Sequence, residues 1–126
     1  MNGSLIGLWI FAGMIYQGHQ LPPPNPNLIM SYDFLPDGQN KLSYHRLNEK
    51  GSCQRTANYL HDEVSKTLYQ KVVQVDPNNA SWCSDDLDMR DGTETWNKAW
   101  VENETLHLML NLGEESLTYL WKKKDP

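Results

Sequence analysis

The sequence predicts an all-β fold in which eight antiparallel strands follow one another as an up-and-down meander and close into a barrel. Turn-forming residues recur at short intervals along the 126 residues, for example at 36–38 and 77–79. Between the turns, apolar and polar residues alternate, most clearly at 105–112, where leucine occupies positions 106, 108, 110 and 112. Because successive side chains of a strand point to opposite faces, this alternation is typical of a sheet with one buried face. No segment has a sustained helical period.

The expected elements follow the chain in order. The first strand covers residues 5–17 and is bent at Gly13. A proline-rich segment at 21–27 comes next, and we expect an extended loop there because prolines cannot donate the hydrogen bonds of a sheet. A second long loop is expected at 77–93. The other seven strands are expected at 28–35, 41–47, 53–60, 67–75, 94–101, 105–112 and 116–123. We expect one domain over residues 1–126, which is long enough to bury a core.

The first expected strand has an alternative interpretation. Residues 5–16 are almost wholly apolar, which also fits the hydrophobic region of a signal peptide. Against a signal peptide, no Lys or Arg precedes this segment, and residues 16–19 lack the usual pattern of small residues at a cleavage site. The segment is also too short to span a bilayer. We therefore favour a strand, and we expect no membrane-spanning segment elsewhere.

Composition and motifs argue against several classes of function. The net charge of −5 disfavours nucleic-acid binding, which needs a basic surface. The four histidines are scattered without metal-ligand spacing, and the acidic stretch at 83–92 departs from the pattern of a calcium-binding loop. No nucleophile elbow and no glycine-rich phosphate loop is present. We therefore expect a protein that is not an enzyme and that has no metal and no cofactor.

The two cysteines, Cys53 and Cys83, are expected to form a disulfide bond. Cys53 opens the first strand of an expected hairpin, and the chain returns to the same end near Cys83. In the chain-entropy view, such a bond contributes roughly 3–4 kcal/mol of stability. It would place the protein outside the cytoplasm, in a periplasmic or secreted location, because disulfides persist in oxidising compartments. The alternative is a pair of buried free thiols in a reducing compartment.

Two arginines are candidates for ligand binding. Alternation places Arg46 on the same inward face as Tyr44, and Arg55 on the same inward face as Tyr59. The short turn at 48–51 places Arg46 and Arg55 on neighbouring strands at similar depth, so we expect both guanidinium groups close together, inside the barrel or at its rim. A buried guanidinium is costly unless it is paired, so we expect an anionic partner between or beside the two arginines. That partner is either the carboxylate of a bound ligand or an internal carboxylate. An internal hydrogen-bond network or a position at the barrel rim would also satisfy either arginine. Tyr44, Arg46, Arg55 and Tyr59 are the predicted ligand-binding residues.

A short motif and the order of strands resemble a known family. Gly7-Leu8-Trp9 opens the first strand, and the pair Lys122-Lys123 ends the last one. In these features the chain resembles a lipocalin-like, calycin-type β-barrel. The resemblance implies that Trp9 packs at the closed end of the barrel, with Lys122 or Lys123 as the cation over its ring.

Two functions are consistent with these expectations. The first is a secreted or periplasmic binding protein, without enzymatic activity, that holds a small apolar or amphipathic ligand, including a carboxylate-bearing one, in its barrel. The alternative is a structural or protein-interaction barrel whose lumen is filled by side chains and takes no small-molecule ligand. A small barrel enzyme, whose site would be assembled from residues distant in the sequence, is a third hypothesis, which the motifs disfavour.

Overall fold

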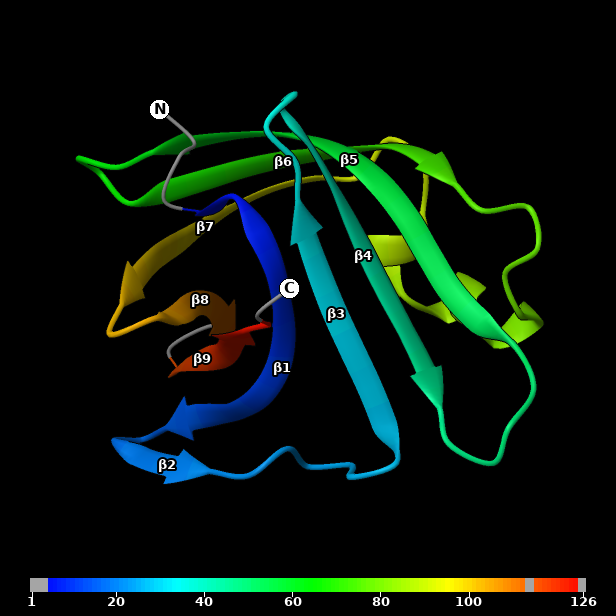
Figure 1. The fold of residues 1–126 in the computed structure, drawn as a ribbon, viewed down its shortest axis with the longest axis horizontal. Helices are drawn as coiled ribbons and strands as arrows, with labels where there is room; N and C mark the ends of the chain where they lie inside the picture. The colour runs from blue at the N-terminus through cyan, green and yellow to red at the C-terminus, as the bar shows by residue number, and fades with distance from the viewer. Residues whose placement is uncertain (1–4, 113–114, 125–126) are drawn as a thin grey trace.

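Nine antiparallel strands form one sheet, and eight of them close into a barrel in up-and-down order (Figure 1). The computed structural model describes residues 5–112 and 115–124. The all-β barrel expected from the sequence is therefore confirmed. The strands are β1 (Gly7–Tyr16), β2 (His19–Leu21), β3 (Leu28–Phe34), β4 (Gln39–Arg46), β5 (Ser52–Asp62), β6 (Thr67–Val75), β7 (Glu94–Glu102), β8 (Thr105–Leu112) and β9 (Glu115–Lys123).

Strand β1 closes the barrel because it pairs with β3 on one side and with β9 on the other, and β1 and β9 lie side by side in Figure 1. The register with β9 shifts between Phe11 and Gly13, which marks a β-bulge. A Cβ atom at Gly13 would lie 2.7 Å from the carbonyl oxygen of Leu21, and the φ angle there is +158°. Only glycine permits this close approach, so the expected bend at Gly13 has a steric basis.

The short strand β2 was not predicted from the sequence. It forms a hairpin with β1, and the turn between them consists of Gln17 (φ 50°) and Gly18 (φ 79°). Two residues with positive φ are typical of a tight hairpin turn, but the usual sequence signal is Asn-Gly or Asp-Gly rather than Gln-Gly. The first strand was therefore expected to run on to residue 17, whereas the hairpin ends it at Tyr16.

Alternation along the strands determines which side chains face inward, as the sequence predicts. On β5 the inward residues Cys53, Arg55, Ala57 and Tyr59 are all buried, with exposed fractions of 0–3%. On β8, Leu106 and Leu108 are buried, whereas the side chain of residue 112 lies outside the described part. The inner face of the sheet therefore supplies the core.

The closed end of the barrel is built around Trp9, which is 1% exposed. Its indole Nε1 donates a hydrogen bond to the carbonyl oxygen of Leu5 at 2.9 Å. The ammonium of Lys123 lies 5.7 Å from the centre of the indole ring, within the range of a cation–π contact. Beyond Trp9, the rings of Phe34 and Tyr59 meet edge to face at 5.0 Å between their centroids. This end of the barrel is therefore filled by aromatic side chains.

The cation over Trp9 is Lys123, the second of the two lysines that the resemblance allows, and Lys122 does not occupy this position. Trp121 is buried on the inner face, so the next residue along β9 points outward and the one after it points inward. Lys122 accordingly donates to the hydroxyl of Thr105 at 2.8 Å on the outer side. A Cβ atom at Gly7 would lie 2.9 Å from Cε of Lys123, so the glycine of the motif leaves room for the lysine stem.

The long loop between β6 and β7 contains two short 3₁₀ turns, η2 (Ser81–Asp85) and η3 (Leu87–Met89). In Figure 1 these turns lie next to β5. Among the described residues, no helix has the length and apolar character needed to cross a membrane.

Replacing Trp9 with alanine should lower the free energy of unfolding by about 3–5 kcal/mol, because it leaves a large cavity at the closed end. Urea unfolding followed by circular dichroism measures this loss. Trp96→Ala is the matched control, since Trp96 is 62% exposed, and it should cost less than about 1 kcal/mol. Equal losses for the two variants would contradict the packing of the closed end.

Candidate ligand-binding cavity

A cavity of about 830 Å³ occupies the barrel beyond its filled end. Ligand pockets commonly measure about 300–1,000 Å³, so this volume suits a small molecule. Every barrel strand except β5 contributes a side chain to the wall. The apolar part of the wall consists of Phe11, Leu28, Met30, Leu42, Leu108, Leu110, Tyr119 and Trp121.

The mouth of the cavity is formed partly by the loop between β6 and β7. This loop contributes Trp82, Leu87 and three carboxylates, Asp85, Asp86 and Asp88. The side chain of Asp86 also caps η3, because its Oδ1 accepts a hydrogen bond from the backbone N–H of Asp88 at 2.9 Å. The mouth is therefore more acidic than the apolar wall beneath it.

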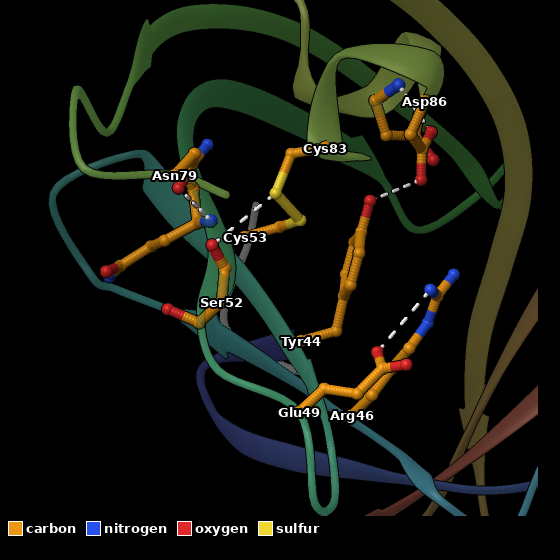
Figure 2. The surroundings of a disulfide bond; sticks show 10 residues. Tyr44, Arg46, Glu49, Ser52, Cys53, Asn79, Cys83 and Asp86 are labelled. Atoms are coloured by element: carbon orange, nitrogen blue, oxygen red, sulfur yellow. Dashed lines mark hydrogen bonds and ion pairs between the residues drawn. A yellow bond between two sulfur atoms is a disulfide. The ribbon is translucent and has the colours of Figure 1, made fainter. Parts of the chain in front are cut away.

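A disulfide bond between Cys53 and Cys83 fastens the mouth loop to β5, with 5.7 Å between the two Cα atoms (Figure 2). The disulfide prediction is thereby confirmed. Asn79 adds a second connection, because its side-chain amide donates to the carbonyl oxygen of Gln54 and its Oδ1 accepts from the Gln54 N–H. The disulfide bond and the two hydrogen bonds of Asn79 therefore hold the same end of the loop against the barrel.

Tyr44 connects the barrel wall to the mouth loop. It is 8% exposed, and its hydroxyl donates to a carboxylate oxygen of Asp86 at 2.5 Å (Figure 2). Burial, followed by the hydrogen bond and the negative charge of Asp86, raises the pKa of the Tyr44 phenol well above its usual value. Tyr44 therefore stays protonated and acts as a donor. It lines the cavity, as expected for a ligand-binding residue.

Arg46 lies at the rim of the cavity, where 44% of its side chain is exposed. Its guanidinium is 3.7 Å from a carboxylate oxygen of Glu49 (Figure 2). The same guanidinium lies over the ring of Trp82, 4.5 Å from its centre. The rim position is one of the arrangements that the sequence left open. Because both groups are well exposed, the ion pair itself contributes little to stability.

Arg55 lies below the cavity and is 3% exposed. Its guanidinium donates to the side-chain oxygens of three residues, Asn40, Tyr32 and Gln70. The Gln70 oxygen also accepts from the Tyr32 hydroxyl at 2.6 Å and from the Asn40 amide at 2.8 Å. Four side chains therefore form one buried network, in which no carboxylate takes part.

The network provides hydrogen-bond acceptors for both terminal nitrogens of Arg55, which is one of the alternatives that the sequence left open, whereas the buried Nε has no partner among the described residues. Tyr32 and Gln70 belong both to this network and to the cavity wall, whereas Arg55 itself does not line the cavity. Arg55 therefore supports the cavity floor from beneath and has no direct contact with the space above.

The two arginines do not lie at the same depth, so the expectation that they form one close pair of cations is wrong. They are on neighbouring strands, as predicted, but Arg55 is opposite Leu42 in the register. Arg46 lies four residues further along β4, which corresponds to roughly 13 Å at 3.3 Å per residue. Each arginine is stabilised separately, and no anion is needed between them.

Tyr59 also lies apart from the other predicted ligand-binding residues. Its hydroxyl donates to the carbonyl oxygen of Leu35 at 2.9 Å, and its ring packs against Phe34 in the filled end of the barrel. It does not line the cavity. Of the four residues predicted together, Tyr44 and Arg46 meet at the mouth, Arg55 lies under the floor and Tyr59 lies in the closed end.

The sequence did not indicate several residues of this cavity and of the network beneath it. Gln70 lies on a strand with apolar residues on both faces, so its inward direction was not evident. Asn40 precedes the strand that we expected to begin at residue 41, and it is fully buried. Trp82 and Asp86 lie in the long loop, where no periodicity indicates direction. The one sequence feature that indicated where this loop lies was the expected disulfide between Cys53 and Cys83.

The carboxylates give the mouth a negative potential. Desolvation first, and the charge of Asp86 second, raise the pKa of Asp88, although the charge of Arg55 opposes this rise. Burial raises the pKa of the Tyr119 phenol, and Asp86 and Asp88 raise it further. Asp88 lines the cavity, although it is exposed as a whole residue.

Comparisons with known proteins identify no relative: no family model, no curated protein and no solved structure matches this chain.

Replacing both Cys53 and Cys83 with serine should lower the free energy of unfolding by about 2–4 kcal/mol, because the bond restricts a loop of 30 residues in the unfolded chain. Chemical denaturation with and without reductant measures the effect. Reductant should destabilise the wild-type protein to the level of the variant and leave the variant unchanged. Two reactive thiols in the unfolded, non-reduced wild-type protein would contradict the bond.

Replacing Gln70 with leucine should destabilise the protein by about 3 kcal/mol or more, because it removes the oxygen that three buried donors share. The matched control is Gln74→Leu on the same strand, since Gln74 is exposed. That change should shift the stability by less than about 0.5 kcal/mol. Thermal and urea unfolding measure both variants, and equal stability of the two would contradict the network.

Proposed function

We propose that this protein is a lipocalin-like, non-enzymatic binding protein that holds one small apolar or amphipathic ligand in its barrel. The observation that carries the proposal is the cavity of about 830 Å³ with an aliphatic and aromatic wall. Moving an alkyl or aryl group from water into such a wall is favourable by about 25 cal/mol for each Å² of apolar surface buried. Shape and apolar burial would therefore supply most of the affinity.

The cavity wall also contains an unused hydrogen-bond donor. Trp121 is 2% exposed, and among the described residues its indole Nε1 has no hydrogen-bond partner. A buried donor without a partner costs free energy. A ligand with a hydroxyl or carbonyl group close to this wall would satisfy it, so the cavity favours amphipathic ligands over pure hydrocarbons.

The lipocalin-like assignment draws support from two features of the fold. The barrel has eight antiparallel strands in up-and-down order, and the first of them carries the motif Gly7-Leu8-Trp9. The pairing of Trp9 with a cation from the last strand, Lys123, agrees with what the resemblance implies for the closed end.

An extracytoplasmic location, either periplasmic or secreted, is part of the proposal. The disulfide between Cys53 and Cys83 supports it, because such bonds are rare in reducing compartments. In this setting the bond would keep the mouth loop attached to the barrel while the protein carries its ligand.

A second candidate function, protein interaction through the barrel surface, is favoured by one row of side chains. Leu60 is opposite Tyr69, and Tyr69 is opposite Trp96 across three neighbouring strands. Leu60 and Trp96 are 67% and 62% exposed. The open lumen, however, favours ligand binding over a barrel filled by side chains.

The uncharged fluorophore N-phenylnaphthylamine tests the proposed function. We expect saturable binding of one molecule for each protein, with a rise in fluorescence as the probe leaves water. Leu110→Trp adds a large ring to the cavity wall and should weaken binding by about tenfold or more, equivalent to about 1.4 kcal/mol.

The control for this experiment is Met109→Trp, which adds the same bulk one position along β8, on the outer face. Circular dichroism should show that both variants keep the β-barrel spectrum. No saturable binding to the wild-type protein, or equal weakening in the two variants, would contradict a ligand site in the lumen.

A further inference from the structure

We propose that the polar end of the ligand is an organic cation, an alkyl or aryl ammonium group, and that Asp86 and Asp88 hold it at the cavity mouth. This inference rests on the proposed function, because it assigns the charge of the ligand that the barrel takes. The apolar part of the ligand would fill the wall region, and the ammonium would remain close to solvent.

The first step concerns the charges that line the cavity. They are the carboxylates of Asp85, Asp86 and Asp88 and the guanidinium of Arg46. Arg46 already has an anionic partner in Glu49. None of the three aspartates forms an ion pair with a described residue. The lining therefore has an excess of negative charge, which favours a cation in the mouth.

The second step concerns Asp88. Its carboxylate takes part in no hydrogen bond within the described part of the chain, whereas Asp86 accepts one from the Tyr44 hydroxyl and one from the Asp88 N–H. Desolvation at the cavity and the charge of Asp86 disfavour its ionised form, and the opposing charge of Arg55 offsets these two effects only in part. An incoming ammonium would relieve both effects, because it offers a charge of opposite sign and up to three N–H donors.

The third step concerns the aromatic rings at the same mouth. The guanidinium of Arg46 lies 4.5 Å from the centre of the Trp82 ring, so one face of this indole already receives a cation. The rings of Tyr44 and Tyr119 also line the cavity. Aromatic faces beside carboxylates form the usual environment for organic ammonium groups, since the ring quadrupole attracts positive charge.

The occupant is an organic cation rather than a metal ion. Within the described residues, no group of three or more His, Cys, Asp or Glu side chains is placed to hold a metal. The apolar wall below the mouth also has no role in binding a bare ion, whereas it would bury the hydrocarbon part of an amine.

Three probes with the same hydrocarbon chain test the inference: decylamine, decanol and decanoate. Calorimetric titration near neutral pH and at low salt, below the aggregation concentration of each probe, gives the dissociation constants. We expect decylamine to bind about tenfold more tightly than decanol, equivalent to about 1.4 kcal/mol. Decanoate should bind more weakly than decanol, because like charges meet at the mouth.

Asp88→Asn removes one carboxylate from the mouth without removing a described hydrogen bond. It should weaken the binding of decylamine by about five- to tenfold and leave that of decanol unchanged. Asp91→Asn is the matched control, since it makes the same change of net charge in the same loop but outside the cavity lining. It should alter neither constant by more than about twofold.

The outcomes separate the two proposals. Decylamine binding that is no tighter than decanol binding, or equal effects of Asp88→Asn and Asp91→Asn, would overturn the inference and leave the proposed function intact. If decanoate binds most tightly of the three probes, the inference is also wrong, and the mouth binds an anionic group at Arg46 instead. If none of the three probes binds, both the inference and the proposed function are wrong.

Discussion

The structure depends on the closure of the sheet between β1 and β9. An open eight-stranded sheet would have two unpaired edges and no enclosed space, whereas closure gives every barrel strand two neighbours and divides the side chains into an inner and an outer set. Strand β1 must curve to reach both β3 and β9, and it does so at the bulge beside Gly13. The absence of a side chain there allows the carbonyl of Leu21 to approach, so one glycine permits both the bulge and the hairpin that follows it.

Alternation made most of the fold predictable from the sequence, because the side-chain period of a strand is two and one face is buried. The inward residues of β5, Cys53 to Tyr59, follow from it directly. The same period explains why Lys123 rather than Lys122 lies over Trp9, because moving from one lysine to the next changes the face of the sheet. Alternation does not give register, however. Arg46 and Arg55 were expected at similar depth, and only the pairing of Arg55 with Leu42 shows how far apart they lie.

The candidate site was less predictable than the fold because part of it comes from a loop. Loops lack a period, so the sequence could not indicate that Trp82 and Asp86 reach over the barrel. It did indicate the disulfide, since a hairpin returns the chain to its starting end, and that bond accounts for the position of the loop. Gln70 was missed for another reason. A polar side chain on a strand with two apolar faces gives no sign that buried donors elsewhere need its oxygen.

The buried network around Arg55 offers a physical reason for the cavity above it. Apolar side chains alone would tend to collapse and fill the lumen, as they do around Trp9 at the closed end. Tyr32 and Gln70 cannot move into the lumen without breaking bonds to Arg55, and a buried guanidinium left without partners is costly. The network therefore fixes the floor, while the disulfide fixes the mouth. With a guanidinium beneath the floor and carboxylates at the mouth, the cavity is polarised along its length, and the elongated ligand that we propose would have one preferred orientation within it.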